Sequence, residues 1–277
     1  MARVLSKRDL TPVTKLFVVE APLIARNARA GQFVMLRVNE AGERVPVTIT
    51  DFDRKAGTVT IVVQVVGKTT ALICALEPGD DVLDFVGPLG RPVSLPSEGH
   101  VALVGGGFGA GAIYTLAAEL KSRGVRVSAI VGARTRDLLI LQDELRTVTN
   151  HLYACTDDGS LGHKGFVTEF LQDLLDAEAG FTSCYAIGPI AMMRALAEVT
   201  RPYELPTIVS LDPIMVDGTG MCGACRVTVG GELRFACVDG PFFDAHQVDF
   251  AEAVVRSKMY AEEQQLAARM VGLGAGT

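Results

Sequence analysis

The rhythm of apolar segments changes near residue 99, and this change limits the folds that the chain can adopt. Before it, short runs rich in Val, Ile and Thr (QFVMLRV, RVPVTIT and TVTIVVQVV) are separated by the turn signals NEAGE, DRKAG and EPGDD. Closely spaced strands of this kind predict a β-barrel or a β-sandwich. One helical segment, TTALICALEPG, interrupts them and ends at Pro78 and Gly79. We therefore expect residues 1–98 to form a β-rich domain.

After residue 99, apolar strands alternate with helices. The segments HVALVGGG, VRVSAIVGA, HLYACTDD, SCYAIGP and PTIVSLD are strand-like, and GAIYTLAAELKSRG, KGFVTEFLQDLLDAE and AMMRALAEVTR between them are helical. Such alternation predicts an α/β domain, here residues 99–212, in which helices cover both faces of a parallel sheet. The remaining residues, 213–277, open with a cysteine motif and end in a segment of helical propensity. They predict a third, smaller domain.

Charge and composition argue against several classes of protein. The formal net charge of -6 argues against a nucleic-acid binder, which presents a basic patch. The first residues lack the apolar core of a secretory signal. Residues 101–118 carry no charge and are long enough to span a bilayer, but five glycines interrupt them, so we expect a strand, a tight loop and a helix there. Six cysteines, three of them clustered, favour a cytoplasmic chain without structural disulfides and without a membrane anchor.

A glycine-rich loop, GGGFGAG, lies between the first strand and the first helix of the α/β domain. Glycines at such a turn let a phosphate approach the backbone amides, although a tight turn without a ligand is the alternative. The loops GAR (132–134), TDDGS (156–160) and IGP (187–189) are expected at the same carboxyl edge of the sheet, and their convergence favours a dinucleotide. The candidate residues are Gly105, Gly106, Gly107, Gly109, Gly132, Arg134, Gly188 and Pro189. Arg134 and Arg136 are either ligands of a 2'-phosphate or solvated surface charges.

Two segments of the β-rich domain are candidates for binding a second phosphate group. In VGKTT, Gly67 allows close approach, and the hydroxyls of Thr69 and Thr70 either bind a phosphate or cap the following helix. Arg44, just before an apolar strand, either pairs with a pyrophosphate or is an edge charge that discourages aggregation.

Three cysteines near the carboxyl end are spaced as metal ligands. Cys222, Cys225 and Cys237 follow C-x2-C-x11-C, and Asp217 precedes Cys222 by five residues. Plant-type [2Fe-2S] ferredoxins use C-x4-C-x2-C…C, so a carboxylate stands here in place of the first thiolate. The segment RVTVGGELRFAC predicts a hairpin that turns at Gly230-Gly231 and returns Cys237 to the other donors.

A structural zinc site and a redox disulfide remain alternatives for this motif. His246 is nine residues past Cys237 and is expected to be a surface or core residue. The other cysteines, Cys74, Cys155 and Cys184, lie in apolar segments and are expected to be packed thiols.

Taken in order, these segments resemble the ferredoxin-NADP reductase superfamily, in particular its branch with a carboxyl-terminal [2Fe-2S] domain. The dihydroorotate dehydrogenase electron-transfer subunits belong to that branch. The motifs ERVPVTITDFD, VVQVVGKTT, DFVGPLGRP, GARTRDLLILQDEL and MVDGTGMCGACRVTVGGELRFACVDGP are most similar to the small FAD/[2Fe-2S] subunits of NADH-dependent reduced ferredoxin:NADP oxidoreductases. Asp217 is similar to that bifurcating group, whereas the dihydroorotate group keeps a cysteine there. The glycine loop departs from the family, because Gly111-Ala112 stands where Ala-Pro is usual.

The resemblance implies a β-barrel FAD domain, a dinucleotide-binding α/β domain and a [2Fe-2S] domain. It implies that Arg44, Pro46 and Thr48 line the flavin and that Gly67, Thr69 and Thr70 hold the FAD pyrophosphate. Asp217 and the three clustered cysteines would bind the cluster, and NAD(H), with NADP(H) still open, would lie across the glycine loops.

As function, the resemblance implies an electron-transfer oxidoreductase subunit that works with a larger flavin and [4Fe-4S] subunit and, through it, with ferredoxin. Two alternatives remain. The chain would otherwise be the electron-transfer subunit of a dihydroorotate or sulfide dehydrogenase, or a non-catalytic zinc-containing module that senses the redox state of a dinucleotide.

Overall fold

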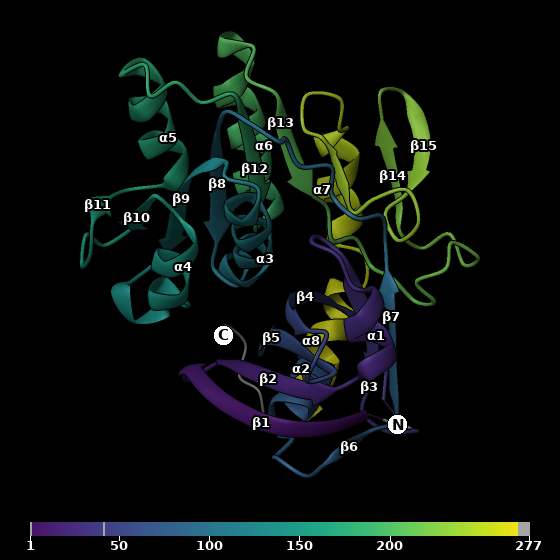
Figure 1. The fold of residues 1–277 in the computed structure, drawn as a ribbon. Helices are drawn as coiled ribbons and strands as arrows, with labels where there is room; N and C mark the ends of the chain where they lie inside the picture. Colours follow the sequence, from purple (N-terminus) through teal and green to yellow (C-terminus); the bar gives the residue numbers. More distant parts are fainter. Residues whose placement is uncertain (1, 41, 271–277) are drawn as a thin grey trace.

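Two seven-stranded sheets organise the chain, and a two-stranded hairpin lies beside them (Figure 1). The computed structural model of the protein describes residues 2–40 and 42–270. The first sheet forms a nearly closed barrel, the second is an α/β sheet, and the cysteines of the motif flank the hairpin. The expected fold class is confirmed.

The barrel sheet is antiparallel, with the strand order β6-β1-β2-β5-β4-β3-β7. Its strands are β1 (Ala2–Thr11), β2 (Thr14–Glu20), β3 (Phe33–Arg37), β4 (Val45–Asp53), β5 (Thr58–Gln64), β6 (Asp81–Val82) and β7 (Asp84–Leu89). Alternate residues of β5, namely Val59, Ile61 and Val63, are buried in the barrel interior. This period of two is the pattern of a strand that has one face on a core.

Two parts of the barrel domain were missed by the sequence analysis. The β1–β2 hairpin precedes the first expected strand, and a short helix, α1 (Pro22–Asn27), follows it with proline in its first turn. The expected helical segment at 69–79 is shorter and forms α2 (Lys68–Cys74).

The α/β sheet has the order β11-β10-β9-β8-β12-β13-β16. Its parallel strands are β8 (His100–Gly106), β9 (Arg126–Ala133), β10 (His151–Thr156), β11 (His163–Lys164), β12 (Ser183–Ile187) and β13 (Thr207–Ser210). The helices are α3 (Gly109–Ser122), α4 (Gln142–Val148), α5 (Val167–Asp176) and α6 (Ile190–Thr200), with two 3-10 turns at Arg136–Leu138 and Arg201–Tyr203. Every residue of the central strand β8 is buried, as expected for a strand covered on both faces.

The two faces of this sheet have separate apolar cores. Leu103 of β8 packs in one core with Leu116 of α3, and Val104 packs in the other with Leu171 of α5. Among the described residues no helix is long and apolar enough to span a membrane. The uncharged segment 101–118 forms most of β8, the glycine loop and the first part of α3.

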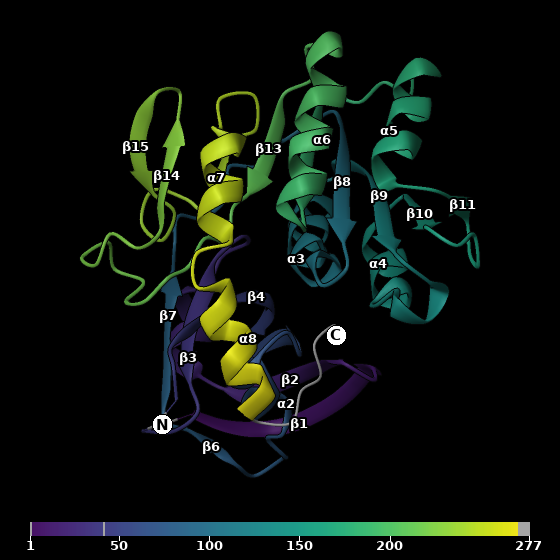
Figure 2. The ribbon, with the colours of Figure 1, turned by 180° about the vertical axis from the view of Figure 1, so that it is seen from behind.

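The last part of the chain does not form a separate layer. Its hairpin, β14 (Arg226–Val229) and β15 (Glu232–Phe235), is the one expected around Gly230-Gly231. Strand β16 (Phe242–Asp244) then joins the α/β sheet as an antiparallel edge strand on β13. The expected terminal helix is broken into α7 (Phe250–Ser257) and α8 (Ala261–Met270), and α8 lies along the barrel domain (Figure 2).

Helix α3 joins the barrel to the α/β sheet. Thr115 of α3 donates its hydroxyl proton to the carbonyl oxygen of Ile49 in β4 at 3.0 Å. A Cβ added to Gly111 would lie 3.1 Å from Thr50 Oγ1, so the barrel approaches the helix closely at this glycine. The residue that departs from the family pattern therefore lies at the junction of the two sheets.

Candidate functional site

The carboxyl edge of the α/β sheet forms a cavity of about 850 Å³. Gly106, Gly107 and Phe108 line it after β8, Gly132 and Arg134 after β9, Asp157 after β10 and Pro189 after β12. Ligands of open α/β sheets bind at this edge, and the volume suits a large organic ligand. The convergence of loops predicted from the sequence is present.

The predicted glycines divide into two structural groups. Gly107 has a φ of +55° and nothing within 4 Å of an added Cβ, so its backbone is open to the cavity. The other five predicted glycines, at positions 105, 106, 109, 132 and 188, are instead close-packing residues. A Cβ on Gly109 would lie 2.1 Å from the carbonyl oxygen of Ile187, so α3 can begin beside β12 only with glycine there.

The two arginines considered for a 2'-phosphate lie in different places. Arg134 lines the cavity together with Asp157, so a cation and an anion share its wall. Arg136 lines a separate groove, and its backbone N–H donates to Ser160 Oγ at 2.8 Å. Of the two arginines, Arg134 is the one at the cavity.

A second cavity, of about 220 Å³, lies between the barrel and the α/β sheet. Three of the residues that are expected to bind FAD, Pro46, Thr48 and Thr70, line it together with Thr50 and Asp212. Its volume is below the roughly 300–1,000 Å³ of pockets that enclose a whole small molecule. It therefore suits one part of a long cofactor such as FAD.

The remaining flavin-binding candidates lie at the start of α2 and in the loop before β4. The Thr70 hydroxyl accepts the Gly67 N–H at 3.0 Å and donates to the Gly67 carbonyl oxygen, so Thr70 caps the helix. The Thr69 hydroxyl donates to a carboxylate oxygen of Glu43 at 2.6 Å. The Thr69 hydroxyl therefore already donates to an anionic oxygen.

Arg44 also has an anionic partner. Its guanidinium lies 3.1 Å from Asp84 Oδ2, which Arg37 approaches at 2.6 Å. The hydrogen bond from Arg37 is the main cause that lowers the pKa of Asp84. The donors at Thr69 and Arg44 therefore fit a phosphate group, because each already holds a carboxylate in its place.

The four predicted cluster ligands form two pairs. The Cys225 and Cys237 sulfurs are 3.2 Å apart and buried. Asp217 pairs with Cys222, since its Oδ2 accepts the Cys222 N–H at 2.7 Å while its Oδ1 accepts the Thr219 N–H at 2.8 Å. In the described part of the chain, no three carboxylate, imidazole or thiol groups meet as one bound metal ion would require. Two pairs are the distribution with which four ligands hold two irons.

The polarity of this loop favours a bound cation. Backbone amides, above all that of Thr219, lower the pKa of Asp217, so its carboxylate is charged. Burial, followed by the hydrogen bond with Cys225, raises the pKa of Cys237 to about 12. A coordinating metal would reverse the effect on Cys237, because it deprotonates its thiol ligands. The residues present thus fit an iron-sulfur cluster.

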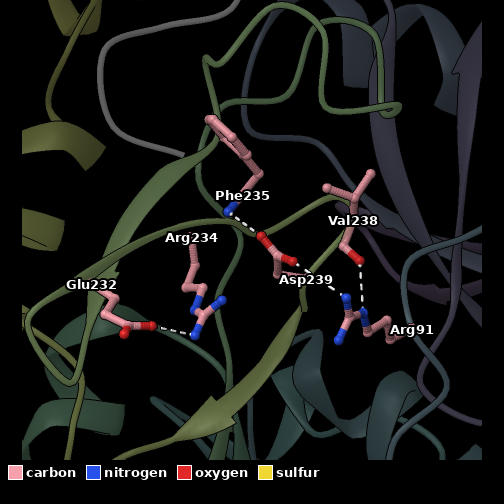
Figure 3. Close-up of polar contacts among 6 residues, drawn as sticks. All are labelled: Arg91, Glu232, Arg234, Phe235, Val238 and Asp239. Atoms are coloured by element: carbon pink, nitrogen blue, oxygen red, sulfur yellow. Dashed lines mark hydrogen bonds and ion pairs between the residues drawn. The ribbon is translucent and has the colours of Figure 1, made fainter.

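The segment after Cys237 is held against the start of the inter-sheet linker (Figure 3). Arg91 donates from Nε to the Val238 carbonyl oxygen at 3.0 Å and lies 3.4 Å from Asp239 Oδ1. The other Asp239 oxygen accepts the Phe235 N–H at 2.9 Å. These contacts hold the segment that follows the β14–β15 hairpin against the end of the barrel domain.

Several residues at the cavities were missed by the sequence analysis. Gln64, Val66 and Phe108 line both cavities and therefore form their common wall. Phe108 carried a signal, because it is the one large side chain inside the glycine loop. Asp212 carried none, since it follows an ordinary strand. His246 lies away from the cysteines as expected, with Nε2 3.0 Å from Thr200 Oγ1.

Comparison with known proteins places the chain in a family. Residues 212–249 match the family described as the iron-sulfur cluster binding domain of dihydroorotate dehydrogenase B. A Thermotoga maritima protein named as a homolog of the dihydroorotate dehydrogenase B (NAD(+)) electron transfer subunit is 46% identical over 250 residues, 90% of this chain and 88% of that protein. The electron transfer subunit of dihydroorotate dehydrogenase B from Geobacillus thermodenitrificans is 36% identical over 254 residues, 88% of this chain and 96% of that subunit.

A solved structure agrees with the fold over nearly the full length. A chain from an NADH-dependent reduced ferredoxin-NADP oxidoreductase, described in connection with flavin-based electron bifurcation, superimposes with a TM-score of 0.93 at 42% identity. The match covers 98% of both chains. The protein therefore belongs to the family of dihydroorotate dehydrogenase B electron transfer subunits and their homologues, which are oxidoreductase subunits.

Proposed function

We propose that this chain is the FAD- and [2Fe-2S]-carrying subunit of an electron-bifurcating ferredoxin:NADP oxidoreductase. It exchanges a hydride with NAD(H) and single electrons with a larger flavin and [4Fe-4S] subunit, which in turn exchanges electrons with ferredoxin. Its clustered cysteines favour the cytoplasm as its location.

One observation carries the proposal: the two cavities adjoin, and the segment that lines the second cavity leads into residues 217–225. We call these residues the cluster loop, because they hold three of the four proposed cluster ligands. Gln64, Val66 and Phe108 separate the cavities. Asp212 and Met215 line the second cavity, and Asp217 follows two residues after Met215. Three redox groups placed in this order would form one path for electrons.

The three groups, when bound, convert the two electrons of a hydride into single electrons, because a flavin exchanges electrons in either way. The chain itself supplies binding and orientation. Gly107 exposes backbone to the dinucleotide, and Arg44 and Thr69 donate to the flavin pyrophosphate. Phe108, 40% exposed, gives the junction of the cavities an apolar aromatic surface that limits water there.

The proposal commits to NAD(H), with NADP(H) as its competitor. The Asp157 carboxylate faces the same cavity as Arg134, and it would repel the additional charge of a 2'-phosphate. Arg136, which was the second candidate for that phosphate, lines a different groove. These positions favour the dinucleotide without the phosphate.

A partner subunit is favoured by the surface of the cluster loop. Val216 and Met221, on the same irregular segment as the exposed Cys222, are 54% and 89% exposed, so the segment presents apolar side chains to solvent. Apolar surface beside a redox group suits a docking partner. A second candidate partner is a dihydroorotate dehydrogenase, favoured by the family match at residues 212–249. A subunit of a sulfide dehydrogenase and a zinc-containing sensor are the remaining candidate functions.

Purification under anaerobic conditions, with identification of the subunit that co-purifies, tests the proposal. We expect one FAD, two irons and two acid-labile sulfides per chain, together with a larger flavin and [4Fe-4S] protein. A dihydroorotate-oxidising partner would replace the bifurcating assignment by the second candidate. Stoichiometric zinc without flavin or labile sulfide would show that the chain is not an electron carrier.

A further inference from the structure

Asp212 is the one titratable side chain among the described residues that line the second cavity. It follows β13 by two residues and lines the cavity together with Thr48 and Thr50 of the barrel. The other lining residues, which come from β3, β4, β5, β13, α2, α3, the adjoining loops and Pro241, are uncharged. A single carboxylate thus faces the space that the proposed function assigns to part of the FAD.

Among the described residues, no charged side chain pairs with the Asp212 carboxylate, which is exposed at the cavity. Water therefore reaches it, but the nearby protein reduces its hydration enough to raise the pKa of Asp212 to about 6, opposed only by its own backbone N–H. A group with a pKa in this range both accepts and releases a proton near neutral pH.

The position of Asp212 in the chain places it between two redox sites. Met215, 5% exposed, is packed three residues later and lines the same cavity. Asp217, with its loop amides, follows two residues after that. Asp212 therefore lies on the segment that leads from the second cavity to the cluster loop.

The proposed function does not yet say which group accepts the proton that each hydride brings. A hydride carries two electrons and one proton, whereas an iron-sulfur cluster takes one electron at a time and no proton. One proton must therefore leave the cavity for each hydride whose electrons go on singly. Among the lining residues in the described chain, Asp212 is the one that can accept it as a base.

We propose, resting on the proposed function, that the Asp212 carboxylate accepts this proton and passes it to water. One Asp212 oxygen forms an O–H bond as the flavin N–H bond that held the proton breaks. The electrons of that bond leave singly for the one-electron acceptors, and the Asp212 O–H then gives its proton to water in the cavity. In the reverse direction, Asp212 supplies the same proton.

Asp212→Asn tests this role, because the amide keeps the shape of the side chain but cannot accept the proton. Asp51→Asn is the matched control, since Asp51 is an exposed carboxylate on β4 beside Thr50 and does not line the cavity. Flavin content is measured first. Rapid mixing then measures reduction by NADH and, separately, reoxidation by ferricyanide, a one-electron acceptor, between about pH 5 and about pH 8.

We expect Asp212→Asn to slow reoxidation by about a hundredfold and to slow reduction by NADH much less. In the wild type and in Asp51→Asn, reoxidation should rise with pH through about 6, as the base form of Asp212 appears, and this rise should be absent in Asp212→Asn. The visible spectrum of the bound oxidised flavin should show the same titration, as a readout independent of turnover.

The outcomes separate the two proposals. Flavin bound in all three proteins, with Asp212→Asn matching Asp51→Asn in both rate profile and spectrum, would overturn the role of Asp212 alone. Wild-type protein that binds no flavin would overturn the proposed function and, with it, this inference.

Discussion

The first cavity, which the proposed function assigns to the dinucleotide, and the loop that holds the proposed cluster ligands are built in different ways. The cavity is the edge of a seven-stranded sheet whose central strand is wholly buried. The cluster loop is irregular backbone beside a two-stranded hairpin. Its shape depends on the amides of Thr219 and Cys222, which donate to Asp217, and on the contact between Cys225 and Cys237.

The cysteines of the two regions also differ in their burial. Cys155 and Cys184 lie buried in strands of the sheet, as expected, and burial raises the pKa of each thiol to about 12. Cys222 is exposed on the loop. Apolar packing thus fixes one region whether or not a ligand is bound, whereas small metal-binding regions draw their folding free energy from the metal itself.

Substitution of Asp217 should have the largest effect, because it acts on the region with the least packing. We expect Asp217→Ala to lose most of its iron, since it removes an anionic ligand and the acceptor of two loop amides. Asp217→Cys should keep a cluster with a shifted reduction potential, because thiolate donates more charge to iron. Iron content, EPR and redox titration measure both effects.

Two further variants test whether Asp217 binds iron or only shapes the loop. Asp217→Asn keeps one oxygen for the loop amides but removes the charge, so full iron content and an unchanged EPR signal in this variant would limit Asp217 to shaping the loop. Cys184→Ala should keep all of the iron and lose about 1 kcal/mol of unfolding free energy, as expected for a packed thiol away from the loop.

A change in the glycine loop should have an intermediate effect. In Gly109→Ala the added Cβ would lie 2.1 Å from a backbone carbonyl oxygen, which cannot move aside as a flexible side chain can. We expect a loss of about 3 kcal/mol in the free energy of unfolding, measured in urea. Unchanged stability would mean that the start of α3 is not held by packing.

Gly67→Ala is the matched glycine substitution in the barrel domain. An added Cβ there has nothing within 4 Å, and the φ of -172° is open to any residue. Stability should stay within about 0.5 kcal/mol. Flavin affinity should fall, because the methyl group would enter the space proposed for the pyrophosphate.

The smallest effect is expected at Arg134, which is exposed. NADH should reduce the bound flavin faster than NADPH in rapid-mixing experiments. Arg134→Ala should weaken binding of either dinucleotide by about fivefold, the scale of one exposed charge interaction. Arg136→Ala should change neither, because its groove is separate. A clear preference of the wild type for NADPH would contradict the assignment to NAD(H).

The sequence was sufficient wherever a short motif determines local backbone. The glycine loop, the loops after β9, β10 and β12, and the Gly230-Gly231 hairpin were all predicted, because strand ends and tight turns leave marks in neighbouring residues. The buried thiols were predicted for the same reason, since a strand covered on both faces is apolar throughout.

Features that depend on distant parts of the chain were not predicted. Pairing of β16 with β13 joins segments that no local pattern connects. The exposure of Asp212 to the second cavity depends on how the two sheets meet. The contacts of Glu43 with Thr69 and of Asp84 with Arg44 were also missed, because charged loop residues look alike in sequence. The pairing of Asp217 with Cys222 and of Cys225 with Cys237 depends on how the chain folds back, which residue spacing alone does not determine.

Strand β16 has a consequence for the solubility of the whole molecule. It pairs Val209 with Phe243 and Ser210 with Phe242, and it covers what would otherwise be the outer strand of the sheet. Without it, β13 would present free backbone donors and acceptors beside a buried valine, a template on which strands of other molecules can assemble. The carboxyl-terminal segment that carries the cysteine motif thus also protects the edge of the α/β sheet at β13 from aggregation.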